Sequence, residues 1–422
     1  MSAQPSPESQ FRCPFARLVP SMRARDPARI DGAGRVVLKL LERLRYGTLD
    51  VQLPDGTVRR YGHGLAGGPR ARVTLANWNV CTAALRLGDT GFAETYLAGD
   101  WTSDDLNALL DILVGNRAAL ETAIYGSWTG RLVQRVRHLR RTNTKAGSRR
   151  NIHAHYDLGN AFYALWLDET MTYSSALFED DPARTLADAQ RAKYRRLLRE
   201  LRIDNADARV LEVGCGWGAF AEVATRETGA HVTGVTLSKE QFAHGRMRIA
   251  QAGLAERIEL RLQDYRDTHG QFDAIASIEM FEAVGERYWP AYFQCLARNL
   301  KRGGRACVQT ITIDDALFAR YRTGSDFIQQ YIFPGGMLPS PSAFAECARQ
   351  HGLKVINQLS FGADYARTLK LWRAAFLARV DAVREQQFDE RFIRLWDFYL
   401  CYCAAAFAHA NTDVIQFTLA HA

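Results

Sequence analysis

The sequence contains no hydrophobic run of about 18 residues, which argues against a membrane-spanning helix. Its start, MSAQPSPESQFRCPFARLVPSM, has no apolar segment and is rich in proline and serine. Residues 1–30 are therefore predicted to form a disordered tail and no signal peptide. No CxxC pair occurs, which argues against a zinc site or a disulfide framework and favours a reducing, cytosolic context. The cysteines are scattered along the chain: Cys13, Cys81, Cys215, Cys295, Cys307, Cys347, Cys401 and Cys403.

The whole chain has a net charge of +8, and one of its segments contains no acidic residue. Residues 131–150, RLVQRVRHLRRTNTKAGSRR, carry eight Arg or Lys side chains. One interpretation is a solvated linker helix, and the other is a surface that binds the phosphate groups of lipid or nucleic acid. The segment has no aromatic residue to stack on bases, and Leu132, Val133, Val136 and Leu139 can form an apolar stripe. These features favour lipid headgroups over RNA.

The length of 422 residues predicts two domains, because a single hydrophobic core rarely serves so long a chain. Residues 31–125 are expected to form a small α+β domain, with a helix from Val36 and a β-hairpin whose turn is LPDGT. A later helix in SDDLNALLDILVGN has Ser103 as its expected N-cap. No catalytic constellation is visible in this domain. Residues 126–150 are predicted to be a basic linker, and residues 151–422 a second domain.

The second domain alternates helical and strand patterns, which predicts an α/β fold with a doubly wound, mainly parallel, Rossmann-like sheet. Its first strand, RVLEV, is apolar on both faces, as a central parallel strand must be. The expected strands are RVLEV, HVTGVTL, IELRLQD, FDAIASI, RACVQTI, LKVINQLS and DVIQFTLA.

The first of these strands leads into a glycine-rich turn, VLEVGCGWGAF, over residues 210–220. The turn lacks the Gly-Lys-Ser/Thr ending of a P-loop, and its G-x-G-x-G spacing differs from a dinucleotide fingerprint. Glu212 would also repel a pyrophosphate. An acid followed by bare backbone instead suits S-adenosylmethionine, which carries an ammonium and a sulfonium. A plain tight turn in another α/β fold is the alternative.

The ends of the next two strands supply further candidates for binding this cofactor. In VTLSKEQ, the neutral side chains of Thr236 and Gln241 are expected to hold the ribose hydroxyls. In QDYRD, Asp264 is expected to accept from the adenine amino group and Tyr265 to stack on the ring. The candidates from these three segments are Glu212, Gly214, Cys215, Gly216, Gly218, Thr236, Leu237, Gln241, Asp264, Tyr265 and Arg266.

Several segments together resemble the cyclopropane-fatty-acyl-phospholipid synthases and the mycolic acid cyclopropane synthases. They are HYDLGNAFYALWLDETMTYSSALF (155–178), VLEVGCGWGAFA, VTLSKEQ, SIEMFEAVGERYW (277–289), YIFPGGMLPS (331–340) and DYARTLKLW (364–372). The resemblance covers about residues 150–420 closely, and the N-terminal domain more loosely. It implies a Rossmann-type S-adenosylmethionine-dependent methyltransferase that adds the methyl carbon across the double bond of an unsaturated acyl chain. A base must then remove a proton so that a ring can close.

The resemblance also implies roles for individual residues. The base is implied to be a bound bicarbonate, and Glu282 and Tyr365 match two of the side chains that hold it. Tyr173 and Ser174 match positions that contact the cofactor. Cys403 matches a cysteine regarded as active in the family, although a thiol in an apolar helical run is expected to be inert.

Two positions depart from the family pattern. Ser175 stands where a cysteine is usual, and Gln309 stands where a histidine is usual. Both side chains can hydrogen-bond an anion, but Gln309 can neither accept a proton nor carry charge. Proton removal is therefore expected to be rerouted, which leaves the product open between a ring and a methyl- or methylene-branched or otherwise modified acyl chain. Glu279 stays an alternative to Glu282.

The predicted function is formation of a cyclopropane ring in the unsaturated acyl chains of membrane phospholipids. The enzyme is expected to be cytoplasmic and to associate peripherally with the inner face of the membrane. A methyltransferase of a different small or polymeric substrate, such as RNA, and a non-catalytic lipid or cofactor binder are the competing hypotheses. No nucleic-acid partner is expected, and whether the chain forms a homodimer is left open.

Overall fold

The computed structural model describes residues 29–62, 68–120, 158–203 and 205–422. The basic linker and almost all of the predicted tail lie outside these described residues, so both stay predictions. No helix among the described residues has the length and apolarity needed to cross a membrane.

The N-terminal part is a small α+β unit. Its elements are α1 (Gly32–Leu41), β1 (Thr48–Gln52), β2 (Val58–Tyr61), β3 (Arg70–Leu75), α2 (Asn79–Leu87), α3 (Asp89–Ala98), β4 (Trp101–Ser103) and α4 (Leu106–Gly115). The strands form one sheet in the order β2-β1-β3-β4. β1 and β2 pair antiparallel with Leu49 opposite Tyr61, as predicted for the hairpin around LPDGT.

Ser103 was predicted as the N-cap of α4, and this prediction is wrong. Its N-cap is Asp105, whose carboxylate accepts a hydrogen bond from the Ala108 backbone N–H at 3.0 Å. Ser103 lies in β4 instead, and its hydroxyl donates to the Arg72 carbonyl at 2.9 Å. Both residues are favourable N-caps, so composition alone does not distinguish them.

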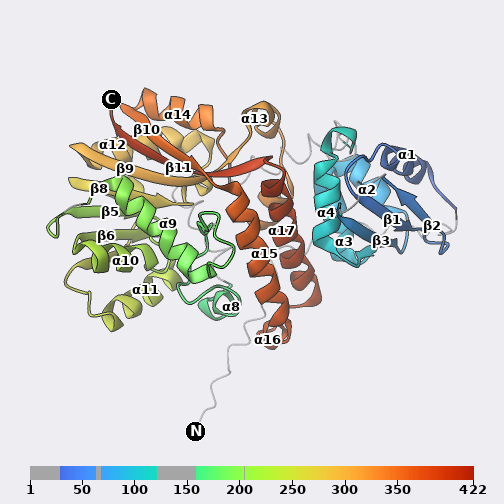
Figure 1. Ribbon diagram of the computed structural model, residues 1–422, viewed down its shortest axis with the longest axis horizontal. Coiled ribbons are helices and arrows are strands. Elements are labelled where there is room, and N and C mark those ends of the chain that lie inside the picture. The colour runs from blue at the N-terminus through green and yellow to red at the C-terminus, as the bar shows by residue number, and fades with distance from the viewer. Residues whose placement is uncertain (1–28, 63–67, 121–157, 204) are drawn as a thin grey trace, which may run out of the picture.

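The C-terminal part contains a seven-stranded sheet with helices on both faces (Figure 1). Its strands are β5 (Arg209–Val213), β6 (His231–Thr236), β7 (Ile258–Leu262), β8 (Phe272–Ile278), β9 (Leu300–Ile313), β10 (Leu353–Ser360) and β11 (Thr412–His421). Its helices are α8 (Asn160–Ala164), α9 (Leu186–Leu201), α10 (Ala219–Thr228), α11 (Lys239–Gln251), α12 (Trp289–Asn299), α13 (Asp315–Tyr321), α14 (Pro341–Gln350), α15 (Gly362–Ala378), α16 (Val380–Glu385) and α17 (Glu390–Ala408).

The strand order β10-β11-β9-β8-β5-β6-β7 confirms the predicted doubly wound sheet. β5 pairs in parallel with both β6 and β8, and its last four residues are buried, as its apolar sequence predicts. β10 and β11 pair antiparallel at the other end of the sheet. In sheets of this kind, ligands bind at the carboxyl ends of the parallel strands, beside the point where the strand order reverses.

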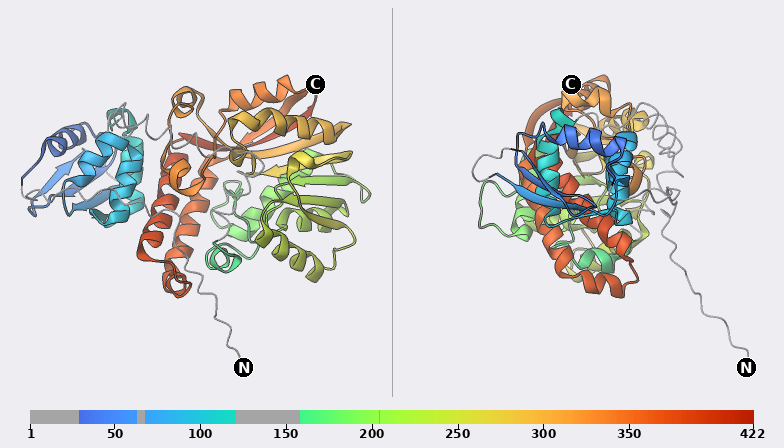
Figure 2. Two further views of the ribbon diagram at one scale, coloured as in Figure 1. Left: turned by 180° about the vertical axis from the view of Figure 1, so that it is seen from behind. Right: turned by 90° about the vertical axis from the view of Figure 1, so that its right-hand side faces the viewer.

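Helices α15 and α17 lie between the seven-stranded sheet and the N-terminal part, as Figure 1 and the left view of Figure 2 show. They pack together through large buried side chains that include Trp372, Phe376 and Trp396. Polar contacts tie α17 to the N-terminal part: the Arg394 guanidinium donates to the Tyr96 carbonyl at 3.0 Å. One continuous hydrophobic core extends across both parts. The domain boundary near residue 125 stays a prediction.

Candidate active site

The glycine turn after β5 has a backbone that side chains would disfavour. Gly214, Gly216 and Gly218 all have positive φ angles, of 85°, 50° and 83°. The N–H groups of Gly214 and Cys215 both donate to the Val235 carbonyl at 3.0 Å, which fixes the turn against β6. A methyl group on Gly214 would lie 2.7 Å from Cγ of Met280. The turn therefore keeps its backbone accessible to a ligand at the carboxyl end of the sheet.

A small cavity of about 150 Å³ opens beside this turn. Of the predicted cofactor-binding residues, all but two line it: Tyr173, Ser174, Glu212, Gly214, Cys215, Gly216, Thr236, Leu237, Gln241, Tyr265 and Arg266. Gly218 lies behind the turn, where it precedes the first residue of α10. Asp264 is buried, and its carboxylate accepts from the Arg266 guanidinium at 2.6 Å. Its proposed contact with adenine stays a prediction.

Glu212 presents a buried carboxyl group at the end of β5. Its side chain is 3% exposed, and one carboxylate oxygen has no hydrogen-bond partner among the described residues. Burial raises the pKa of Glu212 well above its usual value, because an apolar environment disfavours the charged form. A cationic ligand group in the small cavity would compensate that charge, as the sequence predicts for the ammonium of S-adenosylmethionine.

Neutral side chains lie at the end of β6, as predicted. The Thr236 hydroxyl donates to Oε1 of Gln241 at 3.0 Å, and both side chains line the small cavity. Tyr265 follows β7 and also lines it. These positions fit a ribose and an adenine ring, respectively.

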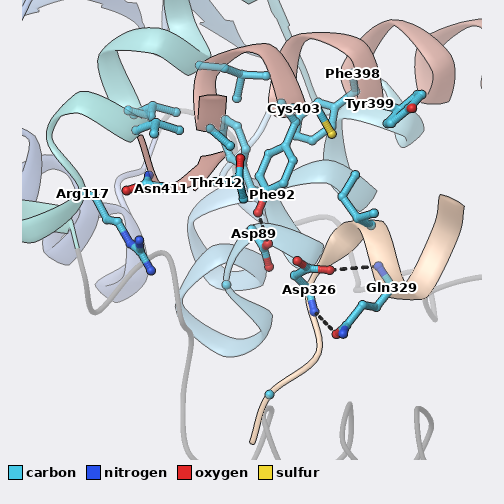
Figure 3. A pocket seen from close by; sticks show the side chains of 18 of the residues that line it. Asp89, Phe92, Arg117, Asp326, Gln329, Phe398, Tyr399, Cys403, Asn411 and Thr412 are labelled. Carbon is cyan, nitrogen blue, oxygen red and sulfur yellow. Dashed lines mark hydrogen bonds between the residues drawn. The ribbon is translucent and has the colours of Figure 1, made fainter. Parts of the chain in front are cut away.

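A second, large cavity of about 710 Å³ lies between the N-terminal part and the C-terminal part (Figure 3). Its walls are mainly aliphatic and aromatic side chains from α1, α2, α4 and the strands of the small sheet, together with α17. Figure 3 shows Phe398, Tyr399 and Cys403 on α17 facing the cavity opposite Asp89 and Phe92 of α3. The sequence of the N-terminal domain shows no catalytic constellation and gives no sign of this wall, because scattered apolar positions become a cavity wall only after folding.

The two cavities share the lining residues Tyr173, Glu279 and Ala283. A ligand in the small cavity and one in the large cavity would therefore meet at these side chains. The phenol of Tyr173 hydrogen-bonds the phenol of Tyr399 at 2.7 Å, which orients it at the junction.

Glu279 brings together three of the predicted catalytic residues. Its carboxylate accepts from the backbone N–H of Ser175 at 2.8 Å, from Nε2 of Gln309 at 2.8 Å and from the Tyr365 phenol at 2.7 Å. The Ser175 hydroxyl donates to the Ala176 carbonyl instead, at 3.0 Å. The sequence analysis gave Glu279 only as an alternative, although its position directly after β8 is where such sheets place functional side chains.

Glu282 lies beside this group and lines the large cavity. One of its carboxylate oxygens accepts from the Ile311 backbone N–H, and the other is buried with no partner among the described residues. Burial, and then the negative charge of Glu279, raise the pKa of Glu282 to about 8. Glu282 is therefore mostly protonated at neutral pH, a state that neither composition nor spacing reveals.

Lys193 of α9 was missed by the sequence analysis. Its side chain is fully buried, and its Nζ donates to the Ser174 hydroxyl at 2.6 Å. Burial lowers the pKa of Lys193 to about 7, and the negative charges of Glu279 and Asp168 act in the opposite direction. A residual positive charge from Lys193 favours the ionised form of the Glu279 carboxyl.

Cys403 lines the large cavity. Burial raises the pKa of its thiol, as expected for an apolar helix, so little thiolate exists at neutral pH. We expect Cys403→Ser to retain activity within about threefold, because no step requires a thiolate nucleophile. Initial rates of the variant and the wild type, together with thiol labelling of the wild type, would test this. A loss of activity of more than about 100-fold in the variant would instead assign the thiol a chemical role.

Comparison with known proteins places these features in a family. The family model described as "Mycolic acid cyclopropane synthetase" matches residues 143–417. "Tuberculostearic acid methyltransferase UfaA1" of Mycobacterium tuberculosis is 42% identical over 341 residues, which are 79% of each chain. "Cyclopropane-fatty-acyl-phospholipid synthase" of Escherichia coli K12 is 34% identical over 377 residues, 87% of this chain and 94% of the relative.

Solved structures agree with the sequence comparisons. The crystal structure of mycolic acid cyclopropane synthase CmaA1 complexed with SAH and CTAB has a TM-score of 0.60 and 35% identity. The match covers 64% of this chain and 97% of that chain. The cyclopropane synthase MmaA2 from Mycobacterium tuberculosis gives a TM-score of 0.60 and 32% identity, over 64% of this chain and 98% of that one.

Proposed function

Because the chain belongs to the mycolic acid cyclopropane synthetase family and is an S-adenosylmethionine-dependent methyltransferase, we propose that it modifies the acyl chains of membrane phospholipids. It transfers the methyl carbon of the cofactor to the double bond of an unsaturated chain. The observation that carries the proposal is the junction of the small, polar cavity with the large, apolar one at Tyr173, Glu279 and Ala283.

The residues of each cavity have separate tasks. When bound, S-adenosylmethionine supplies an electrophilic methyl group on a sulfonium. Glu212 binds its ammonium, the glycine turn gives close backbone approach, and Tyr265 stacks on the adenine. The large cavity holds the acyl chain and excludes water. Both effects are needed because the alkene is a weak nucleophile that reacts only when it is aligned with the methyl group at short range.

A cyclopropane ring is the first candidate product. A methylene- or methyl-branched chain is the second, and the 42% identity to a relative named as a tuberculostearic acid methyltransferase supports it. Ring closure and methylene branching yield isomers of equal mass, whereas a methyl branch needs two further hydrogens from a reductant.

Docking on the inner face of the membrane is part of the proposal. The net charge of +8 and the eight basic side chains of residues 131–150 support attraction to anionic headgroups. The substrate chains are buried in the bilayer, so a peripheral enzyme is the simplest arrangement that reaches them.

We expect the purified protein to transfer label from methyl-labelled S-adenosylmethionine to oleoyl phospholipid vesicles. Proton NMR of the recovered acyl chains separates ring protons from vinylidene protons, which mass cannot do. Free oleic acid and saturated phospholipid vesicles serve as comparison substrates. Label on free acid alone would contradict the phospholipid assignment, and label on saturated chains would contradict attack by a double bond.

A further inference from the structure

Glu279 adopts a backbone conformation that is rare for its residue type. Its φ angle is +47°, in the left-handed region that favours glycine. Such a conformation is energetically unfavourable and persists where surrounding contacts enforce it, often at functional sites. The carboxylate is therefore held at the end of β8 at the expense of backbone strain.

The contacts that hold Glu279 come from three separate elements. The Ser175 N–H belongs to the segment before α9, Gln309 to β9 and Tyr365 to α15. The Gln309 amide is itself fixed, because its Oε1 accepts from Nε2 of Gln416 at 3.0 Å. The carboxylate of Glu279 thus has a single orientation, at the junction of the two cavities.

The bicarbonate implied by the family resemblance does not fit this arrangement. Ser175, Gln309 and Tyr365, three of the residues expected to hold it, already direct donors to Glu279. A bound anion would lie against the Glu279 carboxylate and next to the Glu282 carboxyl. Like charges in a buried site repel strongly, and Lys193 is the nearby cation that acts on Glu279.

We propose that the carboxylate of Glu279 is the base of this enzyme and takes the place of a bound bicarbonate. The inference rests on the proposed function. The alkene π pair forms a bond to the methyl carbon as the carbon–sulfur bond breaks, and sulfur keeps that electron pair as a neutral thioether. The chain is left as a carbocation. Glu279 then removes a proton from the transferred methyl group, and the C–H electron pair closes the ring or, after a hydride shift, forms a methylene.

The neighbouring carboxyl groups have different protonation states. Glu282 holds its proton, since its pKa is about 8. Burial raises the pKa of Glu279 above its usual value and so strengthens it as a base, while the charge of Lys193 and the hydrogen bonds from three donors act in the opposite direction and favour the charged form. Of the two carboxyl groups at the junction, Glu279 is therefore the one that three donors and a neighbouring cation equip to act as a base.

Removal of bicarbonate tests the proposal without any variant. We expect the wild-type rate on oleoyl phospholipid vesicles to change by less than about twofold in buffer freed of carbon dioxide. A rate that falls at least about tenfold and returns when bicarbonate is added would overturn the proposal.

Two substitutions give the complementary test. We expect Glu279→Gln to lower kcat about 100-fold while its affinity for S-adenosylmethionine stays within about threefold. Glu279→Gly removes the carboxylate and relieves the positive φ, so the variant should fold, turn over slowly and regain activity with added bicarbonate. Glu256→Gln changes an exposed carboxyl and should behave as wild type. Full activity of Glu279→Gln would overturn the proposal.

The outcomes separate this inference from the proposed function. Bicarbonate-dependent transfer to acyl chains by the wild type overturns the role of Glu279 and leaves the proposed function intact. A wild type that binds S-adenosylmethionine but labels no acyl chain overturns both.

Discussion

Ala406→Trp should reduce transfer to oleoyl phospholipid below detection, a loss of more than about 1,000-fold, while binding of S-adenosylmethionine is unchanged. Ala406 lies on α17, is half-buried and lines the large cavity. An indole at this position would occupy space that the acyl chain needs. Because it projects into a cavity rather than a filled core, the overpacking cost should stay within about 1–3 kcal/mol.

The matched control for this variant is Ala408→Trp. Ala408 is exposed on the same helix and does not line the cavity, so the same side chain added there should leave the rate within about twofold. Rates would be measured on vesicles with unsaturated chains of decreasing length, together with calorimetric titration of S-adenosylmethionine. Partial recovery with shorter chains would indicate a steric block. An unaltered rate with every chain would show that the substrate binds elsewhere.

This prediction gives the N-terminal part a role in binding substrate. Its aliphatic residues, such as Leu41, Val73 and Leu110, form one side of the large cavity, and α17 forms the other. The family model begins at residue 143, so this wall lies outside the matched region. Relatives that match only the C-terminal part do not share this cavity wall. The wall is therefore a natural place for specificity towards the length of the acyl chain.

The sequence predicted the central features of the fold well because they depend on local patterns. The apolar run RVLEV, the glycines after it and the alternating helices and strands indicate a doubly wound sheet and place the small cavity. Turn chemistry predicted the hairpin at LPDGT for the same reason. The resemblance then extended these local signals to a reaction.

Features that depend on long-range packing were not predicted. Ser175 and Tyr365 are nearly two hundred residues apart, and only folding shows that they converge on Glu279. The φ angle of Glu279 and the burial of Lys193 on the amphipathic helix α9 have no sequence signal. The choice between Glu279 and Glu282 therefore had to stay open until their neighbours were known.

Glu212→Gln should weaken binding of S-adenosylmethionine by about 100-fold, since a charge-assisted hydrogen bond to a buried group contributes roughly 1.5–3 kcal/mol. The amide keeps the shape of the side chain but carries no negative charge to compensate the positive charge of the ammonium. In the free protein, burial raises the pKa of Glu212, so the carboxyl must lose a proton when a cation binds. Wild-type affinity should accordingly increase with pH, and the affinity of Glu212→Gln should not.

Titration calorimetry at several pH values and in buffers of different ionisation enthalpy would measure both effects, because the wild type should release a proton on binding and the variant should not. Glu227→Gln, which alters an exposed carboxyl paired with Arg195, is the matched control and should bind as the wild type does. Thermal unfolding of the variant, in which a neutral amide replaces the buried carboxyl, would show that it keeps the wild-type fold. If Glu212→Gln binds with unchanged affinity and unchanged proton release, the ammonium contacts another group, and Glu212 serves only to shape the end of β5.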